Sequence, residues 1–387
     1  MTPHVLMLGA FAPSLTGFRG PLIRELVRRG WRVTAAAPDM DDATRRALQA
    51  MGAEVATAPL SRTGMNPLAE LGGLVGLRRL FRRVRPDVIL PYTSKPVIWG
   101  ALAAARLGSR RPRVVAMITG LGYAFTPPAR PSLRHATAAV AARVLYRMAL
   151  RRTDRVLFQN PDDLALFTSL GLLPASTPAE VTAGSGVDLE VFAPAPLPPA
   201  PVFLMVSRLL GAKGVREYAS AAVRLKARHP GAVFRLAGWI DPGPDAVAPE
   251  EVDRWIAGGV DYLGRLDDVR PALAEASVFV LPSWREGASR SVLEAMAMNR
   301  PVVTTDAPGC RETVTDGVNG RLVPVRDVDA LAGAMEAFIL DPSLAPRMGV
   351  ESLWMARERY DVRLVNAQVI AALQAALSPP RSAPISR

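Results

Sequence analysis

Two glutamates, Glu286 and Glu294, are separated by seven residues in the second half of the chain. The apolar run 277–283 before Glu286 is typical of a buried strand, and the segment 289–298 around Glu294 has the apolar spacing of a helix. Ser289 and Ser291 are both good N-cap residues. The spacing therefore predicts a strand, a short loop that carries Glu286, and a helix that carries Glu294 within its first two turns.

A helix that starts at this loop would form an anion site, because the amides of its first turn point outward and the helix dipole favours negative charge. The amides in question are those of Gly287, Ala288, Ser289 and Arg290. If a nucleotide bound there through its phosphate, its ribose hydroxyls could donate hydrogen bonds to the Glu294 carboxylate. Glu286 would reach past the phosphates to a transferred sugar. Either glutamate alone could equally be an ordinary solvent-facing residue, whereas the complete string favours a nucleotide-sugar site.

Two cations precede this segment. Arg208 and Lys213 follow the apolar run 202–207, with Gly211 and Gly214 between and after them. Arginine binds phosphate groups bidentately and lysine binds them as a point charge. Surface charge at a strand end is the alternative. No acidic pair in the sequence has the spacing of a metal site.

The elements that position these residues alternate between apolar runs and amphipathic stretches. In the first half the apolar runs are 5–10, 31–38, 87–92, 113–119 and 155–160, and a long helix is expected over 132–152. The alternation restarts after the proline-rich stretch 193–201. This β–α pattern predicts an α/β protein with two doubly wound, Rossmann-like domains that face each other across a cleft. Ligands of such sheets bind beyond the carboxyl ends of the strands.

We expect the following organisation of the chain. Residues 1–194 form an N-terminal domain, 195–201 a linker, and 202–359 a C-terminal domain. A single amphipathic helix is expected over about 360–377, and the tail 378–387 is disordered.

Charge is distributed unevenly. Residues 1–198 hold 25 Lys and Arg against 13 Asp and Glu, whereas the remaining residues hold 22 of each. The excess of 12 positive charges therefore lies in the first half, which suits an anionic membrane surface or a phosphorylated acceptor, although each cluster alone could be a solvated face. Aromatic residues are 6% and scattered, so no stacking platform for nucleic acid is expected.

Other features bear on location. The single cysteine, Cys310, excludes an internal disulfide and is typical of a reducing compartment. No apolar run reaches the roughly 20 residues that span a bilayer, and no signal peptide is evident. We therefore expect a protein of a reducing compartment that is not integral to a membrane.

The string E-G-x5-L-E-A-M-A resembles the retaining nucleotide-sugar glycosyltransferases of family four, which have the GT-B fold. R-L-L-G-A-K-G at 208–214, P-G-C-R-E at 308–312 and G-S-G-V-D-L-E-V-F at 184–192 also match that family. In the first half, T-S-K-P-V-I-W-G and I-T-G-L-G-Y-A-F resemble the subgroup that builds surface polysaccharides and glycans on polyprenyl-diphosphate carriers. Within that subgroup, the nearest functional type transfers N-acetylgalactosamine to undecaprenyl-diphosphate-linked bacillosamine.

The resemblance implies roles for the residues already singled out. Arg208 and Lys213 bind the donor diphosphate, Glu294 the ribose, and Glu286 the donor sugar and its oxocarbenium-like transition state. It implies metal-independent, retaining transfer of a hexose or N-acetylhexosamine, most simply from a UDP-sugar, to a polyprenyl-diphosphate-linked saccharide, with no cofactor beyond the nucleotide-sugar co-substrate. It also implies that the first domain binds the acceptor, that the second binds the donor, and that the C-terminal helix packs back on the first domain. With a lipid-linked acceptor we expect a cytoplasmic protein that is peripheral at the inner face of the cytoplasmic membrane. The acceptor candidates follow first-half strands: Gly17, Arg19, Lys95, Gly120 and Gly122. For Lys95 a solvated loop lysine is the equal alternative.

Two positions depart from the family. After Glu-Gly the family usually has Phe-Gly or a hydrophobic residue and proline, whereas this chain has Ala288 and Ser289. A histidine common after the fourth strand of the first domain is missing from 119–123. The alternatives are a GT-B enzyme with a soluble acceptor, a nucleotide-sugar epimerase, and a non-catalytic polysaccharide-assembly protein.

Overall fold

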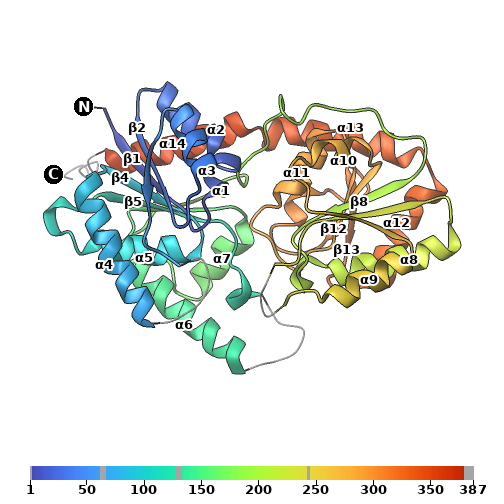
Figure 1. Cartoon of the computed structure of the whole chain (residues 1–387), viewed down its shortest axis with the longest axis horizontal. Helices are drawn as coiled ribbons and strands as arrows, with labels where there is room; N and C mark the ends of the chain where they lie inside the picture. The colour runs from blue at the N-terminus through green and yellow to red at the C-terminus, as the bar shows by residue number, and fades with distance from the viewer. Residues whose placement is uncertain (1, 62–66, 127–132, 242–244, 379–387) are drawn as a thin grey trace, which may run out of the picture. The chain divides into compact units, whose positions relative to one another are not determined.

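The computed structural model of the chain describes residues 2–61, 67–126, 133–241 and 245–378. It divides into two compact units, one of Met1–Thr182 with Val365–Arg387 and the other of Ala183–Leu364 (Figure 1). The expected disordered tail lies outside the described residues from 379 onward. Each unit is an α/β layer structure, as the sequence predicted.

The first unit contains a seven-stranded parallel sheet in the order β3-β2-β1-β4-β5-β6-β7. Its strands are β1 (His4–Leu8), β2 (Arg32–Ala37), β3 (Glu54–Thr57), β4 (Val88–Pro91), β5 (Arg113–Ile118), β6 (Arg155–Phe158) and β7 (Ala179–Val181). Successive side chains of a strand point to opposite faces, so Leu6 and Leu8 join one apolar core and Val5 and Met7 the other. The strands are continuously apolar because both faces are covered.

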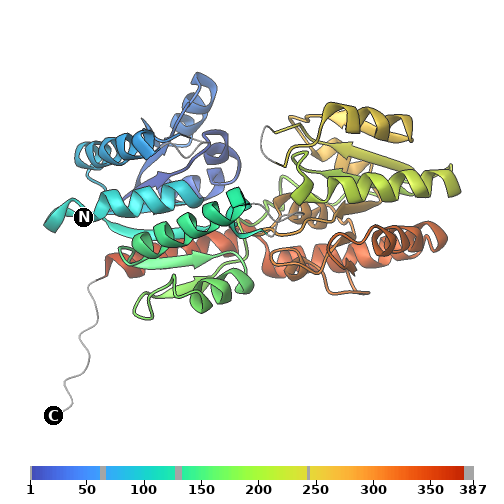
Figure 2. The same cartoon turned by 90° about the horizontal axis from the view of Figure 1, so that it is seen from below.

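Helices cover both faces of this sheet. One core takes side chains from α4 (Pro67–Val84), α5 (Ser94–Ala105), α6 (Leu133–Leu150) and α7 (Pro161–Ser169). The other takes them from α1 (Pro13–Gly17), α2 (Gly20–Arg28), α3 (Asp42–Ala50) and α14 (Val362–Leu377). Figure 2 shows α14, coloured red, among the elements of this unit although it comes last in the sequence. The C-terminal helix therefore packs on the first unit through Val369, Ile370 and Leu373.

The second unit repeats the arrangement with six parallel strands in the order β10-β9-β8-β11-β12-β13. The strands are β8 (Val202–Val206), β9 (Val233–Ala237), β10 (Val260–Gly264), β11 (Val278–Leu281), β12 (Val302–Thr305) and β13 (Gly320–Val323). The helices are α8 (Val215–Arg228), α9 (Pro249–Ala257), α10 (Arg270–Ala274), α11 (Arg290–Ala297), α12 (Val328–Leu340) and α13 (Leu344–Arg359). Helix α8 packs with α12, and α11 packs with α13 on the other face (Figure 1).

The boundary between the units differs from the expected one. Residues 183–194 belong to the second unit and not to the N-terminal domain, and the expected linker packs there as well. A fully buried arginine, Arg300, explains the placement of the linker: its guanidinium donates to the carbonyls of Ala195 and Pro196, at 3.0 and 2.8 Å. It also donates to the carbonyls of Leu273 and Ala274. The hydrophobic pattern of the sequence did not predict that this arginine is buried or that it holds the linker.

In each sheet the strand order reverses once, between β1 and β4 in the first unit and between β8 and β11 in the second. At such a switch point the connections leave in opposite directions and open a crevice beyond the carboxyl ends of the strands. The loops at these two points are therefore the places to look for ligand-binding residues.

Candidate functional site

The segment that carries the two glutamates lies at the switch point of the second sheet. Strand β11 ends at Leu281, a loop follows, and α11 begins at Arg290 with Ser289 as its N-cap. This strand–loop–helix order is the one that the spacing predicted. The Ser289 hydroxyl makes no cap hydrogen bond and faces the Ser291 hydroxyl at 3.3 Å, so the side-chain acceptor that usually covers a helix start is not supplied by Ser289.

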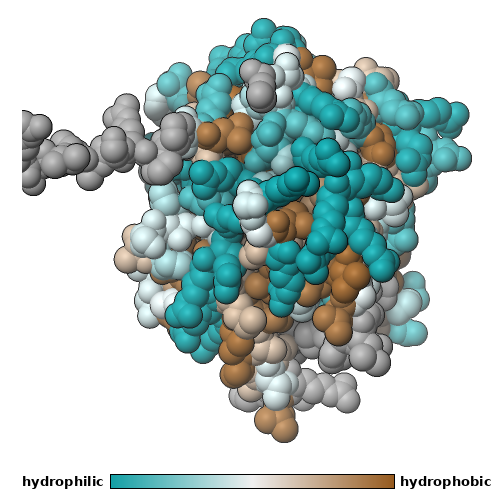
Figure 3. Space-filling view, turned by 90° about the vertical axis from the view of Figure 1, so that its left-hand side faces the viewer, coloured by the Kyte–Doolittle hydropathy of each residue, from teal (hydrophilic) through white to brown (hydrophobic). Residues whose placement is uncertain are grey.

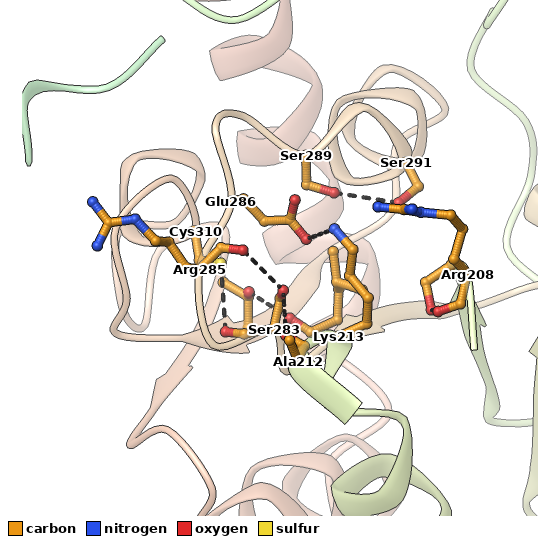
Figure 4. A network of polar contacts seen from close by, with 12 residues as sticks. Arg208, Ala212, Lys213, Ser283, Arg285, Glu286, Ser289, Ser291 and Cys310 are labelled. Carbon is orange, nitrogen blue, oxygen red and sulfur yellow. Dashed lines mark hydrogen bonds and ion pairs between the residues drawn. The ribbon is translucent and has the colours of Figure 1, made fainter. Parts of the chain in front are cut away.

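Lys213 and Glu286 form an ion pair across the switch point. The Lys213 Nζ lies 2.5 Å from the Glu286 Oε1, and the two side chains are 21% and 11% exposed (Figure 4). Lys213 ends a short 3₁₀ turn (Gly211–Lys213) that follows β8, and Gly214 is the N-cap of α8. Two residues that the sequence analysis assigned to diphosphate and sugar are thus brought into direct contact.

Backbone contacts hold the Glu286 loop from two sides. On one side, the amide of Trp284 and the hydroxyl of Ser283 both donate to the Ala212 carbonyl, at 2.9 and 3.1 Å. On the other side, the amide of Glu286 donates to the Pro308 carbonyl at 2.9 Å. Gly309 has a φ of +76°, and a Cβ at that position would lie 2.1 Å from the Glu286 carbonyl oxygen. Only glycine allows this approach without a shift of the loop.

Glu294 is buried within the first two turns of α11. Its side chain is 8% exposed, and its Oε1 accepts a hydrogen bond from the Arg290 Nε at 2.5 Å, one helical turn earlier. Burial raises the pKa of Glu294, and the charge and hydrogen bond of Arg290 oppose that effect. The solvent-facing alternative for this glutamate is therefore wrong.

Arg208 follows β8, and its Nη1 lies 2.7 Å from the Asp241 Oδ2. The Arg208 side chain is 43% exposed and points toward the start of α11 in Figure 4. A second acidic residue after β9, Asp245, accepts a hydrogen bond from the amide of Ala212. Sequence reasoning missed both aspartates. The signal that could have found them is their position after β9, a strand adjacent to β8.

Trp284 begins the segment that the sequence predicts as the donor site, although no role was predicted for its side chain. Its indole Nε1 donates to the Glu217 Oε1 at 2.9 Å, and the guanidinium carbon of Arg326 lies 3.9 Å from its ring centroid. Glu217 is one turn along the chain from Lys213 and is 8% exposed. The tryptophan is thereby fixed between α8 and the loop before α12, next to Glu286.

Two small residues bear on this loop: Ala288 belongs to it, and the Cys310 thiol, in the turn after β12, lies 3.7 Å from the Ser283 carbonyl oxygen. Ala288 packs against Gly184, where a Cβ would lie 2.6 Å from the Ala288 Cβ. Where the family usually has a larger residue, this chain has Ala288, and here the backbone of the segment that begins at Gly184 comes close to it. Cys310 is buried, and burial raises the pKa of its thiol to about 12. A thiol held protonated is no nucleophile at neutral pH.

The proposed acceptor residues lie beyond β1, β4 and β5, three neighbouring strands of the first sheet. Gly17 ends α1, and Arg19 is 4% exposed, with its guanidinium 5.0 Å from the Tyr92 ring centroid. Gly120 and Gly122 have φ values of +101° and +64°. The structure thus places all five candidates at one edge of the sheet, with Arg19 inside the protein rather than at its surface.

Lys95 is not a loop lysine. It lies in the first turn of α5, and its Nζ is 2.6 Å from the Glu70 Oε1 and 2.9 Å from the Ser61 hydroxyl. Its charge is thus compensated within the unit, and its side chain is 21% exposed. An acceptor phosphate would have to share or displace this partner.

Comparisons with known proteins agree with this architecture. A family model described as "Glycosyl transferase 4-like domain" matches residues 20–182, and one described as "Glycosyl transferases group 1" matches residues 200–341. The two matches together span most of the chain. The chain belongs to the group 1 glycosyltransferases and has their GT-B fold of two Rossmann-like domains.

Among its relatives is the N,N'-diacetylbacillosaminyl-diphospho-undecaprenol alpha-1,3-N-acetylgalactosaminyltransferase of Campylobacter jejuni. It is 27% identical over 86% of this chain and 88% of the relative. The UDP-Gal:alpha-D-GlcNAc-diphosphoundecaprenol alpha-1,3-galactosyltransferase of Escherichia coli is 26% identical over 69% of this chain and 70% of the relative. The structure of Anabaena HepE in complex with UDP-glucose superposes with a TM-score of 0.74, at 22% identity over 96% of this chain and 99% of the other.

One further structural finding concerns membranes. Among the helices in the described part of the chain, none combines the length and the apolar character that crossing a bilayer demands.

Proposed function

We propose that this glycosyltransferase moves a hexose or N-acetylhexosamine from a nucleotide-sugar, in the simplest case a UDP-sugar, to a polyprenyl-diphosphate-linked saccharide. The product would serve the biosynthesis of a surface polysaccharide or glycan. The observation that carries the proposal is the contact between Lys213 and Glu286 beside the start of α11, at the switch point of the second sheet. The names of the Campylobacter and Escherichia relatives, both acting on diphospho-undecaprenol-linked sugars, support the acceptor class.

In the proposed donor complex, the diphosphate lies against the start of α11, where the amides of 287–290 favour negative charge. Lys213 and Arg208 supply cations on the side of β8. Both are paired in the structure, with Glu286 and Asp241, so each cation is held close to the place where it acts. Glu294, deeper in the helix, receives the ribose hydroxyls, and Glu286 faces the sugar.

The proposed reaction proceeds with retention of the anomeric configuration. The bond between the anomeric carbon and the diphosphate oxygen breaks, and the acceptor hydroxyl attacks from the face that the diphosphate leaves. Its proton passes to the leaving phosphate oxygen, so no separate protein base is required. Glu286 stabilises the oxocarbenium-like sugar, and Lys213 and Arg208 stabilise the negative charge of the leaving nucleoside diphosphate. We propose that these two cations replace a divalent metal and that no cofactor takes part.

A lipid-linked acceptor determines where the enzyme works. The polyprenyl chain stays in the bilayer, so we propose that the protein acts as a peripheral protein at the inner face of the cytoplasmic membrane. The acceptor diphosphate would approach the edge of the first sheet that carries Gly17, Arg19, Lys95, Gly120 and Gly122. No nucleic acid is expected as a partner.

A donor screen tests the proposal. Purified protein is incubated with UDP-, GDP- and ADP-sugars in the presence of a polyprenyl-diphosphate-linked saccharide, with and without EDTA, and both the released nucleotide and the glycosylated lipid are measured. We expect UDP to be released from a UDP-sugar only when the acceptor is present, and EDTA should not change the rate of release. The anomeric configuration of the new glycosidic bond should be the same as that of the sugar in the donor. Release that is equal with a soluble sugar acceptor would favour the soluble-acceptor enzyme, and sugar isomerisation without transfer would favour an epimerase.

A further inference from the structure

The outer face of α6 exposes apolar side chains to solvent. Leu133 is 81% exposed, Val140 60%, Val144 52% and Met148 49%. Val140, Val144 and Met148 follow one another at intervals of four residues, so they form one row along the helix. A surface helix normally turns this kind of row toward the core. Here the inward face is occupied by other residues, among them Tyr146 and Leu150.

A row of arginines runs beside the apolar row. Arg143, Arg147 and Arg151 have the same spacing of four residues and are exposed. Arg147 donates to the carbonyls of Leu170 and Gly171, which holds its guanidinium near the surface. The stretch 133–153 contains no aspartate or glutamate, so no acidic residue of the helix compensates these charges.

A cavity of about 380 Å³ opens at the C-terminal end of the helix. Its walls are apolar where Leu102, Ala105 and Met148 line it, and basic at Arg106, Arg151 and Arg152. Three guanidinium groups around an apolar hollow suit a phosphate that is attached to a hydrocarbon chain.

Helix α4, which covers the same face of the sheet, repeats the combination: Leu71 and Val75 are 57% and 44% exposed, and Arg79 and Arg82 follow them in an exposed position. Figure 3 looks onto the side of the first unit that carries α4 and shows hydrophobic and hydrophilic side chains intermixed over that surface.

We infer that the outer face of α6, with the cavity at its end, is a docking surface for an anionic phospholipid bilayer. The apolar row inserts among the acyl chains, and the arginine row binds the phosphate head groups. An exposed apolar row flanked by arginines can contact the acyl chains and the phosphate head groups of one membrane surface together. A protein partner would need acidic groups opposite these arginines, whereas an anionic bilayer supplies both the charge and the apolar phase.

The cavity end of this surface lies opposite the substrate edge of the sheet. Helix α6 ends at Leu150, just before β6 begins at Arg155, so the cavity lies near the amino end of that strand. The proposed acceptor residues lie at the carboxyl ends instead. The helix begins after β5, on the side of those carboxyl ends. A bilayer along α6 would therefore run from the acceptor edge toward the opposite edge of the unit. The inference rests on the proposed lipid-linked acceptor for its purpose, but its test does not require transfer activity.

The test measures binding of the full chain to sedimented vesicles of phosphatidylcholine with and without phosphatidylglycerol. One variant removes apolar contacts (Val140→Gln with Val144→Gln), and one removes charge (Arg143→Gln with Arg151→Gln). We expect the arginine variant to bind anionic vesicles about 30-fold more weakly, from the contribution of two arginines near an anionic surface. We expect the valine variant to lose roughly tenfold, because two exposed side chains no longer insert. Wild-type binding should weaken with salt.

Matched controls carry the same substitutions on other surfaces. Arg24→Gln with Arg46→Gln removes two exposed charges from the same basic half, and Leu340→Gln with Val350→Gln changes two exposed apolar residues of the second unit. Both should bind within about threefold of wild type, because screening limits the reach of distant charges. Turnover on a detergent-dispersed acceptor should be the same for docking variants and wild type.

Three results would overturn the inference: docking variants that bind like wild type, controls that lose as much as the docking variants, or equal binding to neutral vesicles. A dimer in solution that only the valine variant dissociates, without vesicle binding, would assign the α6 face to a second copy instead. Failure of the proposed function would appear differently, as intact vesicle binding with no transfer from any donor.

Discussion

Replacing Lys213 with alanine tests the donor site most directly. The change removes a cation whose Nζ lies 2.5 Å from the Glu286 Oε1, and it leaves a carboxylate that is 11% exposed without this ion-pair partner. A charge-assisted contact to a diphosphate contributes about 1.5–3 kcal/mol, which corresponds to roughly 10- to 150-fold in kcat/KM. Because the charge of the leaving diphosphate grows in the transition state, this loss should fall mainly on kcat.

Glu286→Ala should lower kcat to a similar extent, since it removes the carboxylate that faces the sugar. The double variant Lys213→Ala with Glu286→Ala should lose less than the product of the two single losses, because the residues are in contact and act as a unit. Multiplicative losses would contradict the idea that the pair works as one element of the site.

The assay is the initial rate of nucleotide release with a donor that the wild-type enzyme uses, at saturating acceptor. Thermal unfolding shows whether each variant remains folded. Lys226→Ala is the matched control, because this lysine belongs to α8 of the same unit but donates to the carbonyls of Pro230 and Ala232. Its kcat/KM should stay within about twofold of wild type. If Lys213→Ala or Glu286→Ala kept kcat/KM within about threefold, the assignment of the site would be refuted.

Three further predictions concern the support of this site. Because burial holds the pKa of Glu294 above the ordinary 4.5, its stabilising contribution is complete below pH 4.5 and is lost as pH rises through the folded pKa. In denaturant titrations, the free energy of unfolding of Glu294→Gln relative to wild type should therefore be higher at neutral pH than at pH 4.5, and a pH-independent difference would contradict this account. The same variant should have a higher KM for the donor. Arg300→Met should lower the free energy of unfolding of the second unit by about 2–4 kcal/mol, since four carbonyls lose their donor while the cost of a buried charge disappears; a loss under about 0.5 kcal/mol in the same titration would count against the clamp. Gly309→Ala should reduce kcat/KM at least about tenfold by displacing the Glu286 backbone, whereas Gly333→Ala in α12, whose Cβ meets nothing within 4 Å, should leave the rate unchanged.

Much of the fold followed from local patterns. Apolar runs such as 202–207 and 277–283 became β8 and β11, and the helix expected over 132–152 is α6, Leu133–Leu150. These elements could be predicted because strand and helix periodicities are short-range properties of the chain. The start of α11 was predictable to within a few residues for the same reason: Ser289 and Ser291 were both candidate N-caps, and Ser289 is the N-cap in the structure.

Which residues meet was not predictable in this way. Lys213 and Glu286 are 73 positions apart, and Trp284 and Glu217 are 67 apart, so their contacts depend on how β11 is placed beside β8. The pairing of Lys95 with Glu70 likewise required the packing of α5 beside α4. From the pattern alone, Lys95 could have been a solvated loop lysine or an acceptor residue. In the structure it belongs to α5, and Glu70 compensates its charge.

The sequence by itself determined the class of elements, their order, the basic character of the first half and the types of residue that could bind a nucleotide-sugar. Only the tertiary structure decided the unit boundary before Ala183, the burial of Glu294 and Arg19, and the contact that joins Lys213 to Glu286. The physical reason is the range of the interactions. Periodicity and capping act over a few residues, whereas burial and ion pairing depend on groups that come together only when the parallel strands of each sheet are assembled.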